Sequence, residues 1–294
     1  MMAEIHFIGI GKMGLPMALH LMRAGHALTV SDTSAERLQL ARTQGMAVAA
    51  DAAAAIAQAE VVFSSLPGDA VLRSVAGQVA ARAKAGTIYV DASTVSQQAS
   101  AHAAQSCAKS GVDYLRATVS GNNKMAEAAQ LTVMASGPRA AYDEVLPLLR
   151  LFGTQQFYLG EAEEARLMKL VVNLMIAQTS AMLAEGLALG RKGGLDWRDM
   201  WQVLAASAVG SPIVKAKAVQ LSERDFTPTF TVEQMIKDLD LILGAGQANH
   251  VPLPQTALTL QLMHTAVAQG DALDDYAAII KAVERSAGLP VHLE

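Results

Sequence analysis

Glu4-Ile-His-Phe-Ile-Gly-Ile-Gly-Lys-Met-Gly14 is the stretch that decides the fold of this chain. The mostly apolar run from Ile5 to Ile10 predicts a buried strand, and a helical pattern of apolar residues starts directly after Gly14. Between them stands Gly9-x-Gly11-x-x-Gly14, a glycine pattern that binds a dinucleotide when it joins a strand to a helix. Gly9 permits a tight turn, Gly11 lets a pyrophosphate approach the backbone, and Gly14 lets the helix pack close to the strand. The free N–H groups and the positive dipole end of that helix would face the phosphates.

The composition predicts a folded protein of two domains. With 294 residues, the chain exceeds the size at which a single core usually keeps growing. The net charge is -4 and no run of Lys or Arg occurs, so we expect no nucleic-acid partner. The single cysteine, Cys107, excludes an intrachain disulfide and favours a reducing compartment; we expect it to be a small buried side chain rather than a nucleophile. Because the first predicted strand begins at Ile5, we expect no signal or transit peptide and a cytoplasmic location.

Strands and helices alternate in the first half of the chain, and this alternation predicts an α/β fold with a doubly wound, mostly parallel Rossmann sheet over residues 1–160. Runs of Val, Ile and Leu without polar alternation predict strands buried on both faces. These strands are 5–10, 27–31, 61–66, 86–91, 112–117 and 130–135. Ser34 and Asp51 are expected to cap helices that follow them.

Residues 161–294 are predicted to form an all-helical domain for substrate binding and dimerisation. The expected helices are 161–190, a long interdomain helix, followed by 197–208, 231–248, 254–269 and 276–287. The longest apolar stretch, 167–189, is interrupted by polar residues such as Lys169 and Glu185. We therefore expect a buried helix there and no membrane span.

Asp32 lies 18 residues after Gly14, where an acid that binds the adenosine ribose hydroxyls is expected. A carboxylate there accepts hydrogen bonds from free hydroxyls and repels a 2′-phosphate, and the next residue is Thr33 rather than a phosphate-binding Arg. NAD is therefore favoured, with NADP as the second choice because Arg37 could turn towards a phosphate. The alternative is that Asp32 is a turn or helix-capping residue, and it could serve both roles.

Lys169 and Asn173 are four residues apart on the long helix, so they share a face in strongly apolar surroundings. Polar groups in such surroundings are costly unless they have partners or line a cavity. A Lys whose pKa is lowered by burial and a nearby cationic nicotinamide would suit proton transfer near neutral pH. The alternative, equally open from spacing alone, is a Lys that extends to the surface and an Asn at a packing kink.

Two loops after predicted strands carry further candidates. Ser93 and Thr94 follow Asp91 at the expected ligand edge of the sheet, or alternatively cap a helix. The stretch Thr118–Asn123 could form an anion nest beside Ser120 and Gly121, or an ordinary polar turn. Lys237-Asp238 is interpreted first as an exposed charge pair. The seven His residues lack metal-ligand spacing, so we expect no metal site.

The ordered set of motifs resembles the β-hydroxyacid dehydrogenase family, which includes 3-hydroxyisobutyrate dehydrogenase and tartronate semialdehyde reductase. The resemblance extends over nearly the whole chain. The motifs that carry it are Gly9-Ile-Gly-Lys-Met-Gly-Leu-Pro-Met-Ala18, Gly25-His26, Leu66-Pro67, Asp91-Ala-Ser-Thr94, Val119-Ser-Gly121, Lys169-x-x-x-Asn173 and Lys237-Asp-Leu239.

This resemblance implies a role for each candidate residue. Lys169 would be the catalytic acid/base and Asn173 its neighbour in the substrate pocket. The remaining implied substrate contacts are Ser93, Ser120, Gly121, Asn122 and Lys237. The implied cofactor contacts are Gly9, Gly11, Lys12, Met13, Gly14, Asp32, Leu66, Pro67, Thr94, Phe230 and Lys237.

The chain departs from the family in one stretch. Where the family has approximately Asp-Ala-Pro-Val-Ser-Gly-Gly, this chain has Arg116-Ala-Thr-Val-Ser-Gly-Asn122. Arg116 places a cation where an acid is expected and would face solvent or a neighbouring loop. Thr118 relaxes φ relative to Pro, and Asn122 adds a side chain beside the proposed anion nest. These changes make 3-hydroxyisobutyrate doubtful as the substrate.

The resulting hypothesis is a reversible NAD(P)-dependent oxidation of a small 3-hydroxy acid, or a related β-hydroxy acid, to its semialdehyde or ketone, by a homodimer or homotetramer. The partner is a small anionic substrate, whose acid group the sequence leaves open as carboxylate or sulfonate. The alternatives are an imine reductase of the same architecture and a dinucleotide-binding regulator without turnover.

Overall fold

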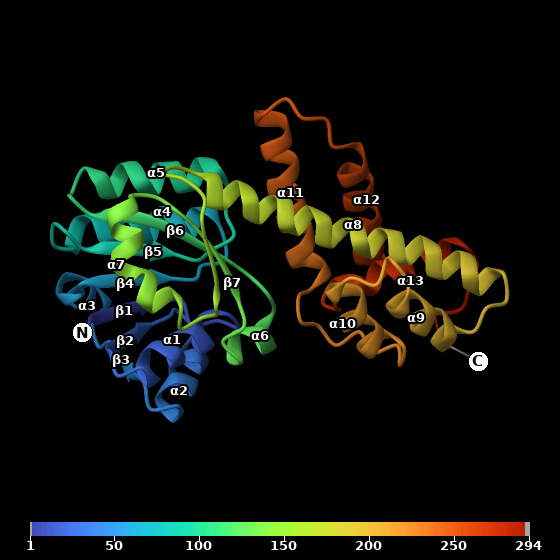
Figure 1. Cartoon of the computed structure of the whole chain (residues 1–294), viewed down its shortest axis with the longest axis horizontal. Coiled ribbons are helices and arrows are strands. Elements are labelled where there is room, and N and C mark those ends of the chain that lie inside the picture. Colours follow the sequence, from blue (N-terminus) through green and yellow to red (C-terminus); the bar gives the residue numbers. More distant parts are fainter. Residues whose placement is uncertain (1, 292–294) are drawn as a thin grey trace. The chain divides into compact units, whose positions relative to one another are not determined.

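A computed structural model describes residues 2–291 of the chain (Figure 1). The chain forms two compact units, which divide between Lys169 and Leu170. This division lies inside the long helix, whereas the sequence places the domain boundary before that helix, at residue 160.

The first unit is built on one eight-stranded sheet with the strand order β3-β2-β1-β4-β5-β6-β7-β8. Neighbouring strands are parallel except for the antiparallel pair β6 and β7. The strands are β1 (Glu4–Ile8), β2 (Ala27–Ser31), β3 (Ala47–Val48), β4 (Val61–Ser64), β5 (Ile88–Asp91), β6 (Asp113–Ser120), β7 (Thr132–Ser136) and β8 (Gln155–Tyr158). The predicted doubly wound, mostly parallel sheet is confirmed, and β3 and β8 are additions at its edges.

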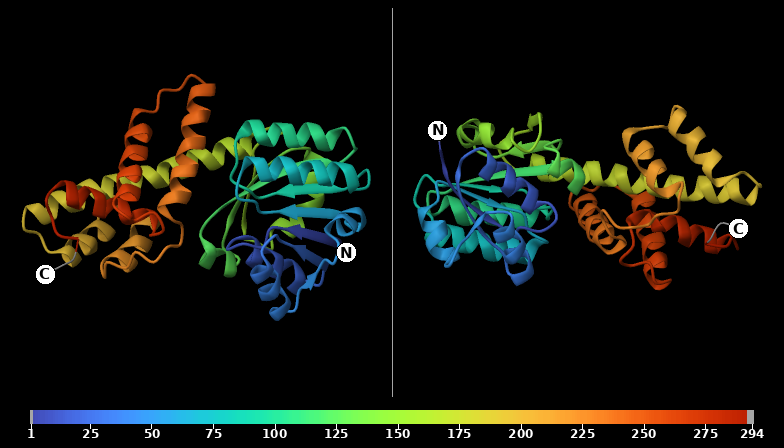
Figure 2. Two further views of the ribbon diagram at one scale, coloured as in Figure 1. Left: turned by 180° about the vertical axis from the view of Figure 1, so that it is seen from behind. Right: turned by 90° about the horizontal axis from the view of Figure 1, so that it is seen from below.

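Helices cover both faces of this sheet (Figures 1 and 2). They are α1 (Gly14–Arg23), α2 (Ala35–Thr43), α3 (Ala52–Gln58), α4 (Asp69–Arg82), α5 (Gln97–Ala108), α6 (Asn123–Glu127) and α7 (Arg139–Leu149). Successive residues of one strand belong to different cores: Phe63 packs with α1 and α7, whereas its neighbour Val62 packs with α3, α4 and α5. This two-residue alternation explains why the strands read as unbroken apolar runs. The predicted caps are also confirmed, because Ser34 caps α2 and Asp51 caps α3.

The second unit is helical. Its elements are the continuation of α8 (Glu164–Lys192), then α9 (Trp197–Ala206), α10 (Pro212–Leu221), α11 (Val232–Ala248), α12 (Pro254–Ala268), η1 (Tyr276–Ala278) and α13 (Ile279–Ser286). Within residues 170–291 the only β-type pairing is an isolated bridge between Thr231 and Asp275. The sequence did not predict α10, which Ser211 caps and Pro212 begins.

The long helix α8 differs from the expectation of a buried helix, because only one of its faces is buried. Ala177, Ser180 and Ala184 are buried, whereas Met175 and Met182 are exposed. By length and composition α8 is the one helix among residues 2–291 that could cross a membrane, and 33% of its apolar window is buried in the protein.

One buried titratable group in the sheet links folding to pH. His6 on β1 is fully buried, with Nδ1 2.8 Å from Thr29 Oγ1 and Nε2 3.0 Å from Ser31 Oγ. Burial lowers the pKa of His6 from 6.5 to about 4, although a backbone hydrogen bond with Thr29 partly opposes this. His6 is therefore neutral in the folded protein at neutral pH.

We expect His6 to reduce stability in acid. Between pH 6.5 and about 4 the unfolded chain binds a proton on His6 and the folded chain does not, so the free energy of unfolding falls as the pH falls through this window. The loss should reach about 3 kcal/mol at the acid end. Denaturant unfolding across this window should show a flatter pH dependence for His6→Asn than for the wild type. The exposed His264→Asn is the control, and identical pH courses for His6→Asn and the wild type would contradict the assignment.

Candidate active site

The glycine-rich loop after β1 has the shape that the fingerprint predicts. Gly9 has φ +86°, and a Cβ on it would lie 2.4 Å from the Ser65 carbonyl oxygen. A Cβ on Gly14 would lie 2.0 Å from the Gly9 carbonyl oxygen. A Cβ on Gly11 would meet nothing within 4 Å. Gly9 and Gly14 are thus required by packing within the protein, whereas the backbone at Gly11 is open to a ligand.

The helix that follows this loop leaves its first N–H groups without a side-chain cap. α1 has no acidic residue in its first turn, and Met13 at its start makes no capping hydrogen bond. The loop lies at the carboxyl ends of β1 and β4, where the strand order of the sheet reverses. This is the place where open α/β sheets bind ligands, and the residues present there fit a dinucleotide pyrophosphate.

The interpretation of Asp32 as a turn residue is confirmed, whereas its binding of the ribose hydroxyls stays a prediction. Its Oδ1 accepts a hydrogen bond from Ser34 N at 2.8 Å, and its Oδ2 accepts one from Ile10 N at 2.9 Å. The carboxylate therefore shapes the turn before α2 and also holds the fingerprint loop. A carboxylate has about four lone-pair sites, so acceptor capacity remains for ribose hydroxyls.

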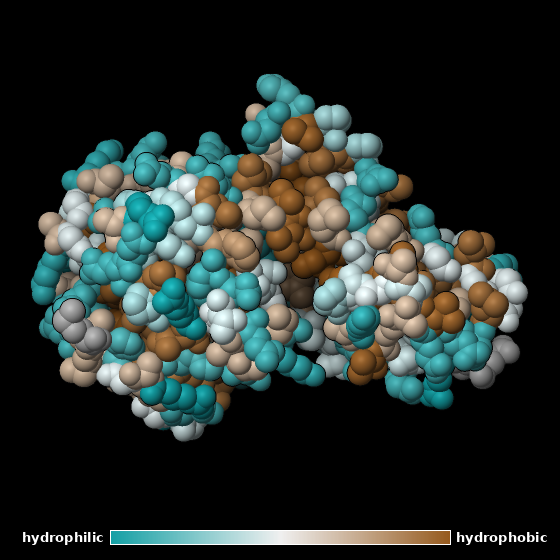
Figure 3. Space-filling view, in the orientation of Figure 1, coloured by the Kyte–Doolittle hydropathy of each residue, from teal (hydrophilic) through white to brown (hydrophobic). Residues whose placement is uncertain are grey.

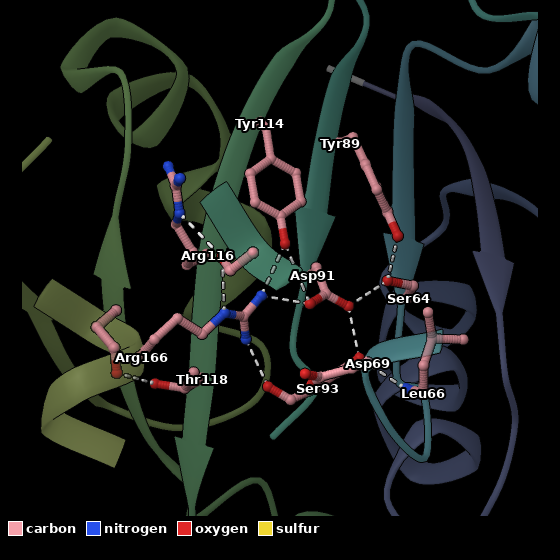
Figure 4. Close-up of polar contacts among 12 residues, drawn as sticks. Ser64, Leu66, Asp69, Tyr89, Asp91, Ser93, Tyr114, Arg116, Thr118 and Arg166 are labelled. Carbon is pink, nitrogen blue, oxygen red and sulfur yellow. Dashed lines mark hydrogen bonds and ion pairs between the residues drawn. The ribbon is translucent and has the colours of Figure 1, made fainter. Parts of the chain in front are cut away.

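A buried polar network stands at the carboxyl end of β5 (Figure 4). Asp91 is fully buried, and its Oδ1 accepts hydrogen bonds from Ser64 Oγ at 2.5 Å and Ser93 Oγ at 2.6 Å. Its Oδ2 forms an ion pair with Arg166 of α8 and accepts a 3.4 Å hydrogen bond from Tyr114 Oη. Within residues 2–291 the side chains that donate to this carboxylate come from β4, the loop after β5, β6 and α8.

The network also fixes the loops that carry predicted site residues. Ser93 Oγ accepts a 2.8 Å hydrogen bond from Leu66 N while donating to Asp91. The alternative role of Ser93 and Thr94 as helix caps is wrong, because Ser96 caps α5. Leu66 and Thr94 are half-buried and Pro67 is exposed.

Arg166 is held in its charged form by its surroundings. Burial alone would lower the pKa of this guanidinium, but Tyr114 and Asp91 raise it above its ordinary value overall. The same burial raises the pKa of Tyr114, with Arg166 partly opposing the change. The pair is therefore a guanidinium and a carboxylate bridged by a neutral phenol.

Arg116 and Thr118, two departures from the family pattern, also face the start of α8. Of the two expectations for Arg116, solvent is wrong and a neighbouring loop is confirmed, since Arg116 is buried and forms an ion pair with Glu163 in the loop before α8. Thr118 lies within β6 rather than in a loop after it. Its Oγ1 lies 3.2 Å from the Met134 carbonyl and 3.1 Å from the Ala165 carbonyl. Both residues therefore connect the sheet to the beginning of the long helix.

The proposed anion-binding loop is shorter than predicted, because β6 continues to Ser120. Gly121 has φ +137°, and a Cβ there would lie 2.7 Å from Leu131 Cδ2. Asn122 caps the short helix α6 by accepting a hydrogen bond from Met125 N at 3.0 Å. The substrate roles of Ser120, Gly121 and Asn122 stay predictions.

In the second unit, Asn173 of α8 has a defined partner. Its Nδ2 donates to Asp238 Oδ2 on α11 at 2.5 Å, and both residues are buried. The NH2 group of the Asn173 amide is therefore bonded to Asp238, and the amide oxygen of Asn173 is left to face other groups. Lys237 Nζ lies 3.0 Å from Asp238 Oδ1, with the Lys side chain 39% exposed and the Asp side chain 2%. The interpretation of Lys237-Asp238 as an exposed charge pair is thus wrong for Asp238.

The remaining candidates are positioned as follows. Lys169 is half-buried in the first turns of α8, and Lys12 is exposed. Phe230 is half-buried and packs edge-to-face on Tyr276, with ring centroids 6.3 Å apart. Burial raises the pKa of the Cys107 thiol to about 12, as expected of an inert side chain. Among residues 2–291 no group of three or more His, Cys, Asp or Glu side chains could hold a metal ion.

Sequence reasoning missed Arg166 and Tyr114 as functional neighbours, and it interpreted Asp238, inside the Lys237-Asp-Leu239 motif, only as half of an exposed charge pair. Arg166 lies just before the Lys169-x-x-x-Asn173 motif. The sequence does indicate Arg166 in one way, because it is a charged residue within the apolar pattern at the start of α8. Burying such a charge is costly unless it has a partner. Its partner, Asp91, is 75 residues away in the sequence.

Comparison with known proteins agrees with this arrangement. A family model described as the NAD binding domain of 6-phosphogluconate dehydrogenase matches residues 4–160. A model described as NAD-binding of NADP-dependent 3-hydroxyisobutyrate dehydrogenase matches residues 164–283. The chain is 34% identical to 2-(hydroxymethyl)glutarate dehydrogenase of Eubacterium barkeri, over 98% of this chain and 97% of that protein. It is 31% identical to 2-hydroxy-3-oxopropionate reductase of Escherichia coli, over 96% of this chain and 97% of that protein.

A solved structure, Mycobacterium tuberculosis 3-hydroxyisobutyrate dehydrogenase with L-serine, superimposes with a TM-score of 0.87 at 28% identity, covering 96% of this chain and 99% of that chain. Since the matches extend over both units and over nearly the full length of these relatives, the chain belongs to the β-hydroxyacid dehydrogenase family of NAD(P)-dependent oxidoreductases.

Proposed function

We propose that this protein reversibly oxidises a small 3-hydroxy acid, or a related β-hydroxy acid, to its semialdehyde or ketone, with Lys169 as general acid/base. One observation carries the proposal most directly. The turn of α8 that bears Lys169 is bonded to the carboxyl end of β5, because Arg166 donates to the Ser93 carbonyl at 2.5 Å. That end of the sheet is where the fingerprint loop and Leu66 also lie.

The residues of the chain have separate tasks in this reaction. The open backbone at Gly11 and the uncapped start of α1 would hold the cofactor, which accepts or returns a hydride when bound. Lys169, as a neutral amine, takes the proton of the substrate hydroxyl during oxidation and returns it during reduction. Asn173, one turn further along α8, orients the substrate with its carbonyl oxygen because Asp238 holds its amide nitrogen. The N–H groups of Ser120 and Gly121 bind the acid group.

The relatives support a small acid as substrate without identifying it. The names of the E. barkeri and E. coli proteins describe a hydroxymethyl dicarboxylic acid and a hydroxylated oxo-acid, respectively. Both contain a short hydroxy-acid framework. We therefore propose a compact anionic substrate rather than a large hydrophobic alcohol.

We expect Lys169→Ala to lower kcat about 100- to 10,000-fold, because general acid–base catalysis contributes that much. The dissociation constant for the cofactor should stay near the wild-type value. The measurement is steady-state turnover in a panel of 3-hydroxy acids, β-hydroxy amino acids and aldehyde acids, with both cofactors. Lys192→Ala, at the far end of the same helix, is the control and should keep normal turnover.

The outcomes separate the alternatives. Near-normal kcat in Lys169→Ala would overturn the role of this residue. Turnover of cyclic imines alone would identify an imine reductase, and cofactor binding without turnover of any compound would identify a regulator.

We also propose that NAD is preferred over NADP, on the basis of the Asp32 carboxylate. Asp32→Ala removes an acceptor for ribose hydroxyls and a charge that repels a 2′-phosphate. The ratio of kcat/KM for NAD to that for NADP should therefore fall about tenfold or more. Because Asp32 also holds Ile10 N, binding of both cofactors should weaken, so the ratio is the informative quantity. An unchanged ratio would remove Asp32 as the discriminating residue.

We propose that a second copy of the chain covers the exposed face of α8. Four apolar residues are spaced by four, seven and seven positions and so lie on one face: Val171, Met175, Met182 and Leu189. Their exposed fractions are 45%, 62%, 65% and 76%. Figure 3 shows hydrophobic side chains gathered over α8 and the neighbouring helices of the second unit. A single chain that leaves such a face in water favours self-association.

The double variant Met175→Glu/Met182→Glu should lower the molar mass measured by light scattering or sedimentation to that of a monomer, because each charge would be buried in the interface. Val71→Glu, an apolar-to-charged change on α4, is the control and should keep the wild-type mass. A wild-type protein that is monomeric at working concentrations would contradict the proposal.

We also propose that the protein works in the cytoplasm, without a nucleic-acid or membrane partner. The single buried Cys107 fits a reducing cytosol. The net charge of -4 fits a protein without a nucleic-acid partner. The buried Asn173–Asp238 pair supports a protein-packed rather than membrane-spanning α8.

A further inference from the structure

Besides its ion pair with Asp91, Arg166 donates hydrogen bonds to three other groups near the carboxyl end of β5. Its Nε donates to Ser100 Oγ at 3.1 Å, its Nη1 donates to the Ser93 carbonyl at 2.5 Å, and its Nη2 donates to Tyr114 Oη at 2.9 Å as well as to Asp91. All three nitrogens of the guanidinium are therefore used, and the side chain is about 1% exposed. Only the planar fork of an arginine presents donors in this arrangement.

The Asp91 carboxylate that Arg166 binds also connects two loops, one after β5 and one after β4. Asp91 accepts from Ser93 Oγ, and Ser93 Oγ in turn accepts from Leu66 N. A chain of three consecutive contacts thus runs from α8 to the loop after β4 (Figure 4). A displacement of the guanidinium would be transmitted to the segments that carry Leu66 and Ser93.

Arg166 also fixes how α8 is rotated about its own axis in the turn before Lys169. The backbone of the preceding residue, Ala165, is held by Ser136 Oγ on its N–H and by Thr118 Oγ1 on its carbonyl. Lys169 follows Arg166 by three residues, so it lies one turn ahead and near the same face of the helix. Once Arg166 is fixed, the direction in which Lys169 leaves the helix is fixed as well.

We propose that Arg166, paired with Asp91, is a positioning residue that sets the place of Lys169 relative to Ser93 and Leu66. The inference rests on the proposed function of Lys169. A purely structural ion pair is a poor explanation, because a buried pair gains little over well-packed apolar side chains. What an apolar pair could not provide is the directed contact to the Ser93 carbonyl.

Arg116 offers a matched control within the same unit. It is buried, donates to the same Ser100 Oγ at 3.3 Å, and pairs with Glu163 next to α8. Within residues 2–291 the hydrogen bonds given for its guanidinium go to Ser100 and Glu163, and neither Asp91 nor Ser93 is among these side-chain partners. The Arg116 guanidinium also lies over the Tyr114 ring, 4.8 Å from its centroid. Comparing lysine substitutions at the two arginines therefore separates the side-chain contacts to Asp91 and Ser93 from the loss of a buried guanidinium beside Ser100 and Tyr114.

The experiment measures kcat, KM and the cofactor dissociation constant for Arg166→Lys and Arg116→Lys in the full-length protein. Arg166→Lys retains the charge but loses the fork, and we expect kcat to fall about 10- to 100-fold, as displaced catalytic groups do. The cofactor dissociation constant should rise by a smaller factor than kcat falls, because Gly9–Gly14 and Asp32 are untouched and only the expected contact at Leu66 is loosened. Arg116→Lys should keep kcat within about threefold of the wild type at a similar free energy of unfolding.

Tyr114→Phe is the second variant, in case Arg166→Lys folds poorly. It removes only the hydroxyl that accepts from Arg166 and donates to Asp91. We expect kcat to fall only about fivefold, because Arg166 keeps its contacts to Asp91, the Ser93 carbonyl and Ser100. Equal kcat losses at both arginines, or an unchanged kcat in Arg166→Lys and Tyr114→Phe, would overturn the positioning role.

Amide hydrogen exchange, measured on the cofactor-free protein, tests the positioning role of Arg166 without relying on turnover. Arg166→Lys should speed amide exchange at Leu66 and in residues 164–170, whereas Arg116→Lys should leave Leu66 unchanged. Unchanged exchange at Leu66 in Arg166→Lys would overturn the proposed connection from Arg166 to the loop that carries Leu66. Absence of wild-type turnover with every hydroxy acid would instead refute the proposed function and, with it, the catalytic part of this inference.

Discussion

The buried ion pair between Asp91 and Arg166 is the constraint on which the proposed reaction depends. Removing two charges from water is costly, and their attraction offsets that cost only when the geometry is good and the remaining donors are satisfied. Here Ser64, Ser93 and Tyr114 supply hydrogen bonds to the carboxylate, and Ser100 accepts one from the guanidinium. The result is a junction between the last residues of β4 and β5 and the first turn of α8. A helix start that is fixed in this way gives a Lys three residues further on a defined direction.

The nucleotide loop is organised by a different kind of constraint, because its shape is imposed by contacts inside the protein. Gly9 and Gly14 are required by neighbouring backbone, and Asp32 ties Ile10 to the start of α2. Only Gly11 faces open space. The loop therefore has its binding shape before any ligand arrives, so little conformational entropy is lost on binding. The glycine loop and Asp32 are thus held by contacts other than the Asp91–Arg166 pair, which reaches the expected cofactor contacts at Leu66 through Ser93.

The sequence predicted those parts of the molecule that local pattern determines. Apolar runs predicted the central strands, and side-chain caps such as Ser34 and Asp51 predicted helix starts. The edge strand β8, Gln155–Tyr158, was missed because it is short and half polar, and its pairing with β7 depends on tertiary structure. The partners of Arg166 and Asn173 were missed for a related reason. They lie 75 and 65 residues away, and neither periodicity nor spacing carries information across such separations.

The contacts of Arg116, Thr118 and Asn122 show what each departure from the family pattern does in the structure. Arg116 pairs with Glu163, and the Thr118 hydroxyl bonds to the carbonyls of Met134 and Ala165, so both act on the start of α8. Asn122 alone lies at the proposed acid-binding loop, where it caps α6. Gly121 before it has no room for a side chain, since a Cβ would meet Leu131 at 2.7 Å. A different side chain at position 122 would therefore act on this loop and on the helix that Asn122 caps, whereas Arg116 and Thr118 contact the segment around the start of α8. Among the three departures, Asn122 is thus the one that acts on the loop proposed to bind the acid group.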